Sequence, residues 1–104
     1  MKKIINGTRY DTDKAERIGY YSYSNSGDFN YLCEKLYITP ISKKYFLAGE
    51  GGANTKYREA MSQNSWSGGE RVLPMDEETA FRWAQEYLSA DEVEEYFLDM
   101  IEDA

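Results

Sequence analysis

The apolar residues of this chain change their spacing at Pro74. From Asp76 onwards they recur every three or four residues in two runs: Ala80, Phe81, Ala84, Tyr87 and Leu88, then Val93, Tyr96, Phe97, Met100 and Ile101. Such spacing places each run on one face of a helix. Asp76 is a suitable N-cap for the first helix, and Ser89 with Glu92 has the pattern of a capping box for the second. The sequence therefore predicts two consecutive C-terminal helices.

Before Pro74 the apolar residues come in short stretches that are typical of strands, and two pairs of stretches are joined by turn residues. The pairs are 2–5 with 8–10, around Asn6-Gly7, and 29–39 with 44–49, around Ser42-Lys43-Lys44. Asn-Gly between two such stretches is the strongest short-range signal of a β-hairpin. We therefore expect two hairpins in this half of the chain.

These patterns together predict an α+β fold. A last short strand is expected at 70–73, where Pro74 would end it. We expect residues 1–104 to form a single domain, in which residues 1–75 are mainly β with short helices and residues 76–104 are an acidic helical pair. The sheet would have four to five antiparallel strands, with helices packed on one of its faces.

Two short helices are expected in the connecting segments. Asp13 and Glu16 have a capping-box spacing, and Gly19 would end the helix that they begin. The following residues, 20–28, would form an edge strand that runs into a loop. Farther along, Asn54 or Thr55 would begin a helix through Met61. The glycines of 49–52 would interrupt regular structure before it, and 62–69 would be a polar loop that contains Trp66.

The composition excludes several kinds of site. The 104 residues include ten tyrosines, one cysteine and no histidine. Without histidine there can be no Ser–His or Cys–His nucleophile pair and no imidazole metal site. A single cysteine cannot form an internal disulfide. No catalytic constellation or metal-ligand spacing stands out, so we expect no catalytic residue, no metal and no cofactor. The N-terminus does not read as a signal peptide and no run approaches a membrane span, so a cytoplasmic location is expected.

The charges are divided unevenly along the chain. Residues 76–104 carry eleven acids and one base, whereas residues 1–75 carry eight acids and eleven bases. On the second predicted helix and its end, the acids gather on the face opposite the apolar run. These candidate partner-binding residues are Asp91, Glu92, Glu94, Glu95, Asp99, Glu102 and Asp103.

Such a carboxylate stripe opposes the stability of the predicted second helix. Asp91–Glu95, Glu95–Asp99 and Asp99–Asp103 would be like-charge pairs four residues apart. Acids near the C-terminal end of a helix are also disfavoured by its dipole. One interpretation is that the charge serves only solubility. The other is that the stripe binds a basic partner, in which arginines would pair with carboxylates as they pair with phosphates.

Other candidate contacts lie in the glycine-rich region. Glu50 stands among Gly49, Gly51 and Gly52, and Tyr57 and Trp66 follow within reach of the same loops. These residues suggest an alternative function, a module that binds a small ligand or a peptide through the 49–52 loop and Trp66. A third possibility is an enzyme that modifies nucleic acid or an effector through its carboxylates.

Three stretches together carry a family resemblance. They are Lys2-Lys3-Ile4-Ile5-Asn6-Gly7-Thr8-Arg9-Tyr10-Asp11-Thr12, then Tyr45-Phe46-Leu47-Ala48-Gly49-Glu50-Gly51-Gly52-Ala53 with Lys56-Tyr57, and Gly68-Gly69-Glu70 through Leu73-Pro74 to Glu78, Ala80, Trp83 and Ala84. In these stretches, which span most of the chain, the sequence resembles a group of short acidic proteins of phages, plasmids and conjugative elements in Gram-positive and gut bacteria. Proteins of this size and habitat include anti-CRISPR inhibitors, some of which act on Cas9-type effectors.

The resemblance and the carboxylate stripe lead to one functional expectation. The protein would be a non-enzymatic inhibitor from a mobile element that binds a basic nucleic-acid-handling surface of a bacterial defence effector, a CRISPR–Cas nuclease of the Cas9 type. Its partner would be a protein, with no direct contact to nucleic acid and no membrane association. Its oligomeric state is left open.

Overall fold

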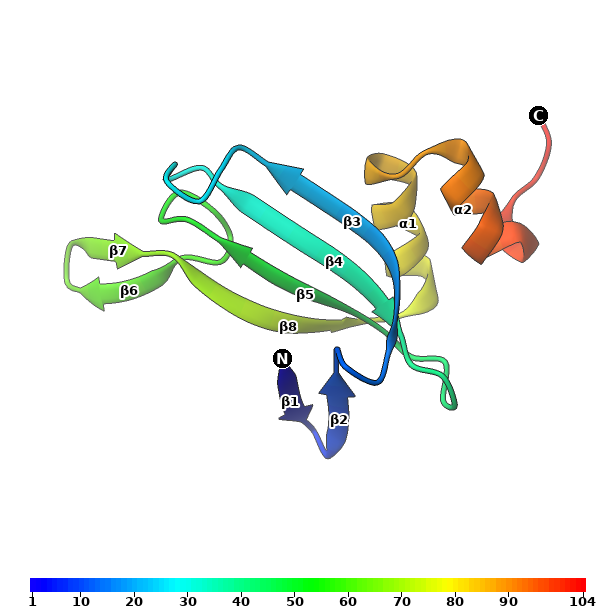
Figure 1. Ribbon diagram of the computed structural model, residues 1–104, viewed down its shortest axis with the longest axis horizontal. Coiled ribbons are helices and arrows are strands. Elements are labelled where there is room, and N and C mark those ends of the chain that lie inside the picture. The colour runs from blue at the N-terminus through cyan, green and yellow to red at the C-terminus, as the bar shows by residue number, and fades with distance from the viewer.

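A four-stranded antiparallel sheet is the centre of the protein. The computed structural model describes residues 1–104. The sheet has the order β3-β4-β5-β8, formed by Glu16–Tyr23, Leu32–Ile38, Tyr45–Gly51 and Gly69–Met75. In Figure 1 it runs obliquely across the molecule, with β3 and β8 as its two edges. This arrangement confirms the predicted α+β class and the hairpin formed by β4 and β5.

Two smaller hairpins flank this sheet. The first, β1 (Lys2–Ile5) with β2 (Thr8–Asp11), turns at Asn6 and Gly7, whose φ angles of 51° and 79° are those of a left-handed two-residue turn. This is the hairpin that Asn-Gly predicts. The second, β6 (Glu59–Ser62) with β7 (Ser65–Ser67), projects from one end of the molecule in Figure 1.

Two helices follow β8 directly. α1 (Glu77–Tyr87) is capped by Asp76, whose side chain accepts a hydrogen bond from the backbone N–H of Thr79. α2 (Ala90–Phe97) begins with the predicted capping box of Ser89 and Glu92. A short 3-10 turn, η1 (Leu98–Met100), ends the regular structure. No helix has both the length and the apolar character that crossing a membrane requires.

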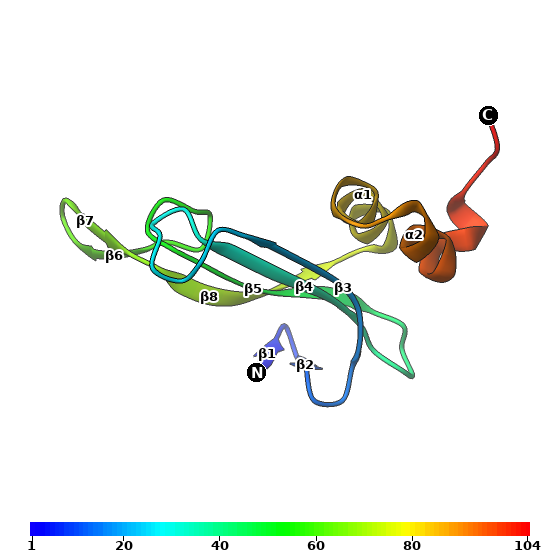
Figure 2. The ribbon, with the colours of Figure 1, turned by 45° about the horizontal axis from the view of Figure 1, so that its top comes forward.

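The two faces of the sheet bury separate apolar clusters, as Figure 2 shows with the helices on one side and β1–β2 on the other. The larger cluster lies under the helices and consists of Ile18, Leu36, Tyr45, Leu47, Ala80, Trp83, Ala84, Val93 and Phe97. The smaller one lies under the β1–β2 hairpin and consists of Tyr10, Tyr37, Phe46 and Val72. Helices therefore cover only one face of the sheet, as predicted.

The prediction of a short helix after Asp13 is wrong. Residues from Glu16 onwards form strand β3, which pairs with β4 through a bulge between Arg17 and Gly19. A Cβ atom at Gly19 would lie 2.8 Å from the Trp83 ring. The absence of a side chain at Gly19 therefore lets β3 pass close to α1. Pairing with β4 and this close approach outweigh the weak local signal of a capping box.

The prediction of a helix from Asn54 or Thr55 to Met61 is also wrong. The 49–52 segment does not interrupt the sheet, because β5 continues to Gly51. The chain then makes tight turns up to Arg58 and enters β6, which takes in Met61. The expected loop at 62–69 contains β7, and β8 continues through Pro74, whose missing N–H is tolerated because β8 is an edge strand.

The second C-terminal helix is shorter than the apolar spacing predicts. α2 ends at Phe97, and Met100 and Ile101 follow in η1 and in the extended tail. Asp99 lies in η1, while Glu102 and Asp103 lie beyond any helix. The argument from the helix dipole therefore does not apply to Glu102 and Asp103, and Asp99 with Asp103 is not a helical pair.

Candidate functional site

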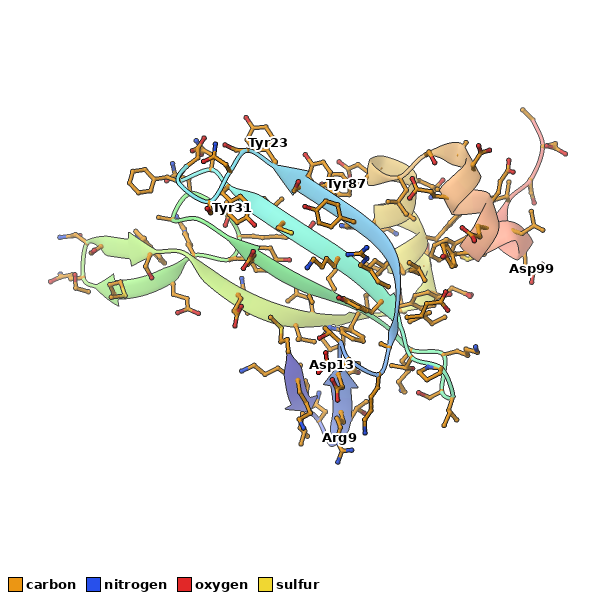
Figure 3. The ribbon with its side chains drawn as sticks, viewed as in Figure 1. Arg9, Asp13, Tyr23, Tyr31, Tyr87 and Asp99 are labelled. Atoms are coloured by element: carbon orange, nitrogen blue, oxygen red, sulfur yellow. The ribbon has the colours of Figure 1, made fainter.

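The first candidate site is an acidic surface at the C-terminal end of the molecule. It consists of six exposed residues of α2, η1 and the tail: Asp91, Glu94, Glu95, Asp99, Glu102 and Asp103. Figure 3 shows Asp99 at the outer end of the molecule, pointing away from the sheet. The name acidic surface is used for these six residues below.

Glu92, the seventh predicted contact, has a structural role of its own. Its carboxylate accepts hydrogen bonds from the backbone N–H of Ser89, at 3.1 Å, and from the Ser89 hydroxyl, at 2.9 Å. The start of α2 therefore accounts for Glu92 without a partner.

No cation neutralises the acidic surface within the protein. The only two ion pairs are Lys56 with Glu34 and Arg82 with Glu78, and neither includes a residue of this surface. Asp91 and Glu95 lie four residues apart on α2, which is the spacing at which like charges destabilise a helix. Part of the predicted repulsion is thus present, although α2 is short.

The second candidate site is a cavity of about 660 Å³ at the opposite end of the sheet, which we call the distal cavity. It brings together Glu50, Gly51, Gly52 and Trp66, four residues of the alternative prediction. Its other lining residues include Asp28, Phe29, Tyr31 and Glu70. Tyr31, labelled in Figure 3, lies far along the molecule from Asp99.

Carboxylates dominate the polar lining of the distal cavity. Glu50 and Glu70 are direct cross-strand neighbours on β5 and β8, a like-charge pair that destabilises a sheet. The Tyr31 hydroxyl donates a 2.8 Å hydrogen bond to Glu50, and this bond raises the pKa of Tyr31. Such a lining repels phosphate and favours cations.

Tyr57, the third predicted loop contact, does not line the distal cavity. It is fully buried on the helix-covered face of the sheet, where its ring lies over Gly49. Any side chain at Gly49 would overlap that ring, so this glycine is required for packing rather than for a ligand loop.

A buried carboxylate at the centre of this face was not predicted. Glu34 on β4 is fully buried and accepts hydrogen bonds from the Tyr57 hydroxyl, at 2.5 Å, and from Trp83 Nε1, at 3.0 Å. Lys56 Nζ lies 2.6 Å from the same carboxylate. The group joins a central strand, the 52–58 segment and α1, which makes it a structural cluster.

The environment of Glu34 keeps it ionised. Burial alone raises the pKa of its carboxyl, but the hydrogen bonds from Lys56, Tyr57 and Trp83 lower the pKa below the ordinary 4.5. Burial and the Glu34 carboxylate together raise the pKa of the Tyr57 hydroxyl well above 10. Both groups therefore hold one protonation state near neutral pH, which suits an anchor better than a proton-transfer group.

The structure places no three His, Cys, Asp or Glu side chains where they could hold a metal ion. Comparison of the chain with protein-family models, with curated proteins and with solved structures found no match.

Proposed function

We propose that the protein is a non-enzymatic inhibitor from a mobile genetic element, acting in the bacterial cytoplasm. It would bind a basic nucleic-acid-handling surface of a defence effector, namely a CRISPR–Cas nuclease. The observation that carries the proposal is the acidic surface, six exposed carboxylates with no cation paired to any of them. Selection for stability alone would place lysines among them.

Inhibition would occur by occupancy of a nucleic-acid channel. Lysines and arginines that bind phosphates would instead bind the carboxylates of α2 and η1, since both groups accept charge-assisted hydrogen bonds from a guanidinium fork. Residues on a helix rise by about 1.5 Å each, so successive carboxylates present a dense row of negative charge. The effector would then be unable to bind its nucleic acid.

The test is DNA cleavage by a purified, guide-loaded CRISPR–Cas nuclease in the presence of the protein. The variant Glu95→Gln/Asp99→Asn neutralises two residues of the acidic surface. Its matched control, Asp13→Asn/Glu59→Gln, neutralises two exposed acids that lie in no ion pair and no side-chain hydrogen bond. We expect the first variant to inhibit at least tenfold less well and the control to inhibit like the wild type. If the two double variants inhibited DNA cleavage to the same extent, the charge-mimicry mechanism would be rejected.

A second candidate function is binding of a small ligand or a peptide in the distal cavity. The supporting observation is that Glu50, Gly51, Gly52 and Trp66 line one cavity together. Its carboxylates favour a cationic group, and the exposed rings of Phe29 and Trp66 offer aromatic surface for one. Within the protein, the Arg58 guanidinium already lies 4.0 Å from the Trp66 ring centre.

A thermal-shift screen separates the two functions. Arginine-containing dipeptides should raise the melting temperature of the wild type but not that of Glu50→Gln, if the distal cavity is a cation site. Nucleotides serve as the anionic control. Absence of any shift with the dipeptides would remove this second function and leave the first unaffected.

A further inference from the structure

An apolar groove lies inside the acidic C-terminal end of the molecule. It has a volume of about 590 Å³ and is lined by α1, α2 and the chain that follows α2. Its apolar lining is Phe81, Leu88, Ala90, Val93, Met100 and Ile101. We call it the C-terminal groove. Its volume is in the range of ordinary ligand pockets.

The polar part of its lining carries only negative charge. Glu94 and Glu102, two residues of the acidic surface, line the groove, and the remaining polar residue is the neutral Gln85. No lysine or arginine lines it. The groove therefore offers an apolar floor with carboxylates at its rim, next to the rest of the acidic surface.

We propose that the C-terminal groove holds an apolar side chain of the partner protein, in a segment where that side chain is flanked by lysines or arginines. This inference rests on the proposed function and specifies its partner. The flanking cations would meet Glu94 and Glu102, while the apolar side chain would cover the solvent-accessible parts of Met100 and Ile101. A partner that offered only lysines and arginines would make no contact with the apolar residues of the C-terminal groove.

Charge complementarity also argues against a second copy of the chain as the occupant. Residues 76–104 carry eleven acids and one base, so two copies docked through this end would bring like charges together. A basic segment reverses that repulsion. An apolar anchor would add specificity that charge pairing alone lacks, because exposed ion pairs contribute little binding energy.

Two synthetic peptides of equal charge provide the test. In both, lysines flank a central position, which is leucine in one and serine in the other. Binding to the full-length protein is measured by fluorescence anisotropy. We expect the leucine peptide to bind about tenfold more tightly, because burial of a leucine side chain contributes roughly that factor.

The groove is probed with Ile101→Ser, which removes part of its apolar wall. The matched control is Leu98→Ser, because Leu98 is a large exposed apolar residue of the same segment that does not line the groove. Ile101→Ser should abolish the preference for leucine and Leu98→Ser should keep it, with circular dichroism confirming that both variants are folded.

The possible outcomes separate this inference from the proposed function. Equal binding of both peptides to the wild type, or equal loss of the preference in both variants, overturns the groove inference while the charge proposal stands. Failure of both peptides to bind at low salt contradicts both proposals. A leucine preference that survives Glu95→Gln/Asp99→Asn while overall affinity falls supports both.

Discussion

At the scale of single residues, Glu34 determines how the helix-covered face is assembled. Its carboxylate on β4 joins the neighbouring residues Lys56 and Tyr57 to Trp83 of α1, so three separate parts of the chain meet at Glu34. All buried side-chain polar atoms in the protein have hydrogen-bond partners. A saturated buried network of this kind specifies one arrangement of its elements, because each wrong arrangement would leave a buried donor or the carboxylate unpaired.

Replacement of Glu34 by glutamine should therefore destabilise the protein. A glutamine oxygen can accept from Trp83 while its NH₂ group faces the Tyr57 hydroxyl, but the Tyr57 proton then loses its acceptor and Lys56 loses its anionic partner. We expect a loss of about 2 kcal/mol in the free energy of unfolding, less than for a fully buried ion pair because Lys56 is half exposed to solvent. Urea unfolding measures this, with Glu59→Gln as the exposed control. An unchanged midpoint for Glu34→Gln would mean that the network does not stabilise the fold.

The same carboxylate predicts a pH dependence. Because folding lowers the pKa of Glu34 below 4.5, its contribution to stability is complete above that value and is lost as the pH falls through the lower pKa of the folded state. The stability difference between wild type and Glu34→Gln should be constant near neutral pH and should shrink below about pH 4.5. Urea titrations at several pH values check this, and a difference that grew on acidification would contradict it.

Gly49 permits the close approach of Tyr57 to the sheet. A Cβ at this position would overlap the Tyr57 ring, so Gly49→Ala should cost about 2 kcal/mol and weaken the hydrogen bond between Tyr57 and Glu34. Gly27→Ala is the matched control, since the nearest atom to its added Cβ would be a side-chain oxygen 3.3 Å away. Thermal unfolding compares the two variants. Similar melting temperatures would show that Tyr57 can move aside.

The sequence predicts contacts between individual side chains less well than it predicts helices and strands. Glu34 occupies the same set of alternate positions on β4 as Leu36 and Ile38, so its position on the helix side follows from strand periodicity, but nothing local identifies its partners. Trp83 lies only three residues after Ala80 and could have been placed on the buried side of α1. The pairing of residues 49 positions apart is a property of the tertiary fold.

At the scale of elements, the helices illustrate what local chemistry can predict. The starts of α1 and α2 follow from Asp76 and from the Ser89–Glu92 box, whose hydrogen bonds are present. The end of α2 does not follow, because the apolar spacing continues past Phe97 while the backbone changes to a 3-10 turn. The start of each helix is determined by a capping side chain next to it in the sequence. At the end of α2, by contrast, Phe97 packs against Tyr45 of the sheet and Phe81 of α1, and the sequence does not show these contacts.

For the strands, the sequence predicts a turn that depends on local residues but not a strand that depends on pairing. Asn6-Gly7 was sufficient to predict the first hairpin, since the required left-handed turn is local. The start of strand β3 carries a local helix signal, but its structure is set by antiparallel pairing with the next strand, β4. The distal cavity likewise depends on loops that meet only in the folded protein; the sequence predicts the 49–52 loop and Trp66 as parts of one site, but not the lining residues Asp28, Phe29, Tyr31 and Glu70.

The capping box gives a prediction at the scale of an element. Ser89→Ala removes the hydroxyl that accepts from the backbone N–H of Glu92 and should lower stability by about 1 kcal/mol. Ser62→Ala, in the exposed hairpin strand β6, is the control. Chemical denaturation should distinguish them. A neutral effect of Ser89→Ala would mean that packing alone sets the start of α2.

At the scale of the whole molecule, charge is distributed along the long axis. The acidic surface lies at one end, beyond the sheet, while the eleven bases of residues 1–75 outnumber the eight acids of the same residues. The structure extends over 48 × 34 × 20 Å, so the acidic surface lies at one end of an elongated molecule. This polarity is the physical basis of the proposed inhibitor.

The most direct test of that claim is the salt dependence of binding to a guide-loaded CRISPR–Cas nuclease. Calorimetry at several salt concentrations gives the slope of log affinity against log salt. We expect a steep negative slope for the wild type and for Asp13→Asn/Glu59→Gln, and a clearly shallower slope for Glu95→Gln/Asp99→Asn, because fewer charges are matched in that complex. Identical slopes for all three proteins, or binding that does not weaken with salt, would contradict the account.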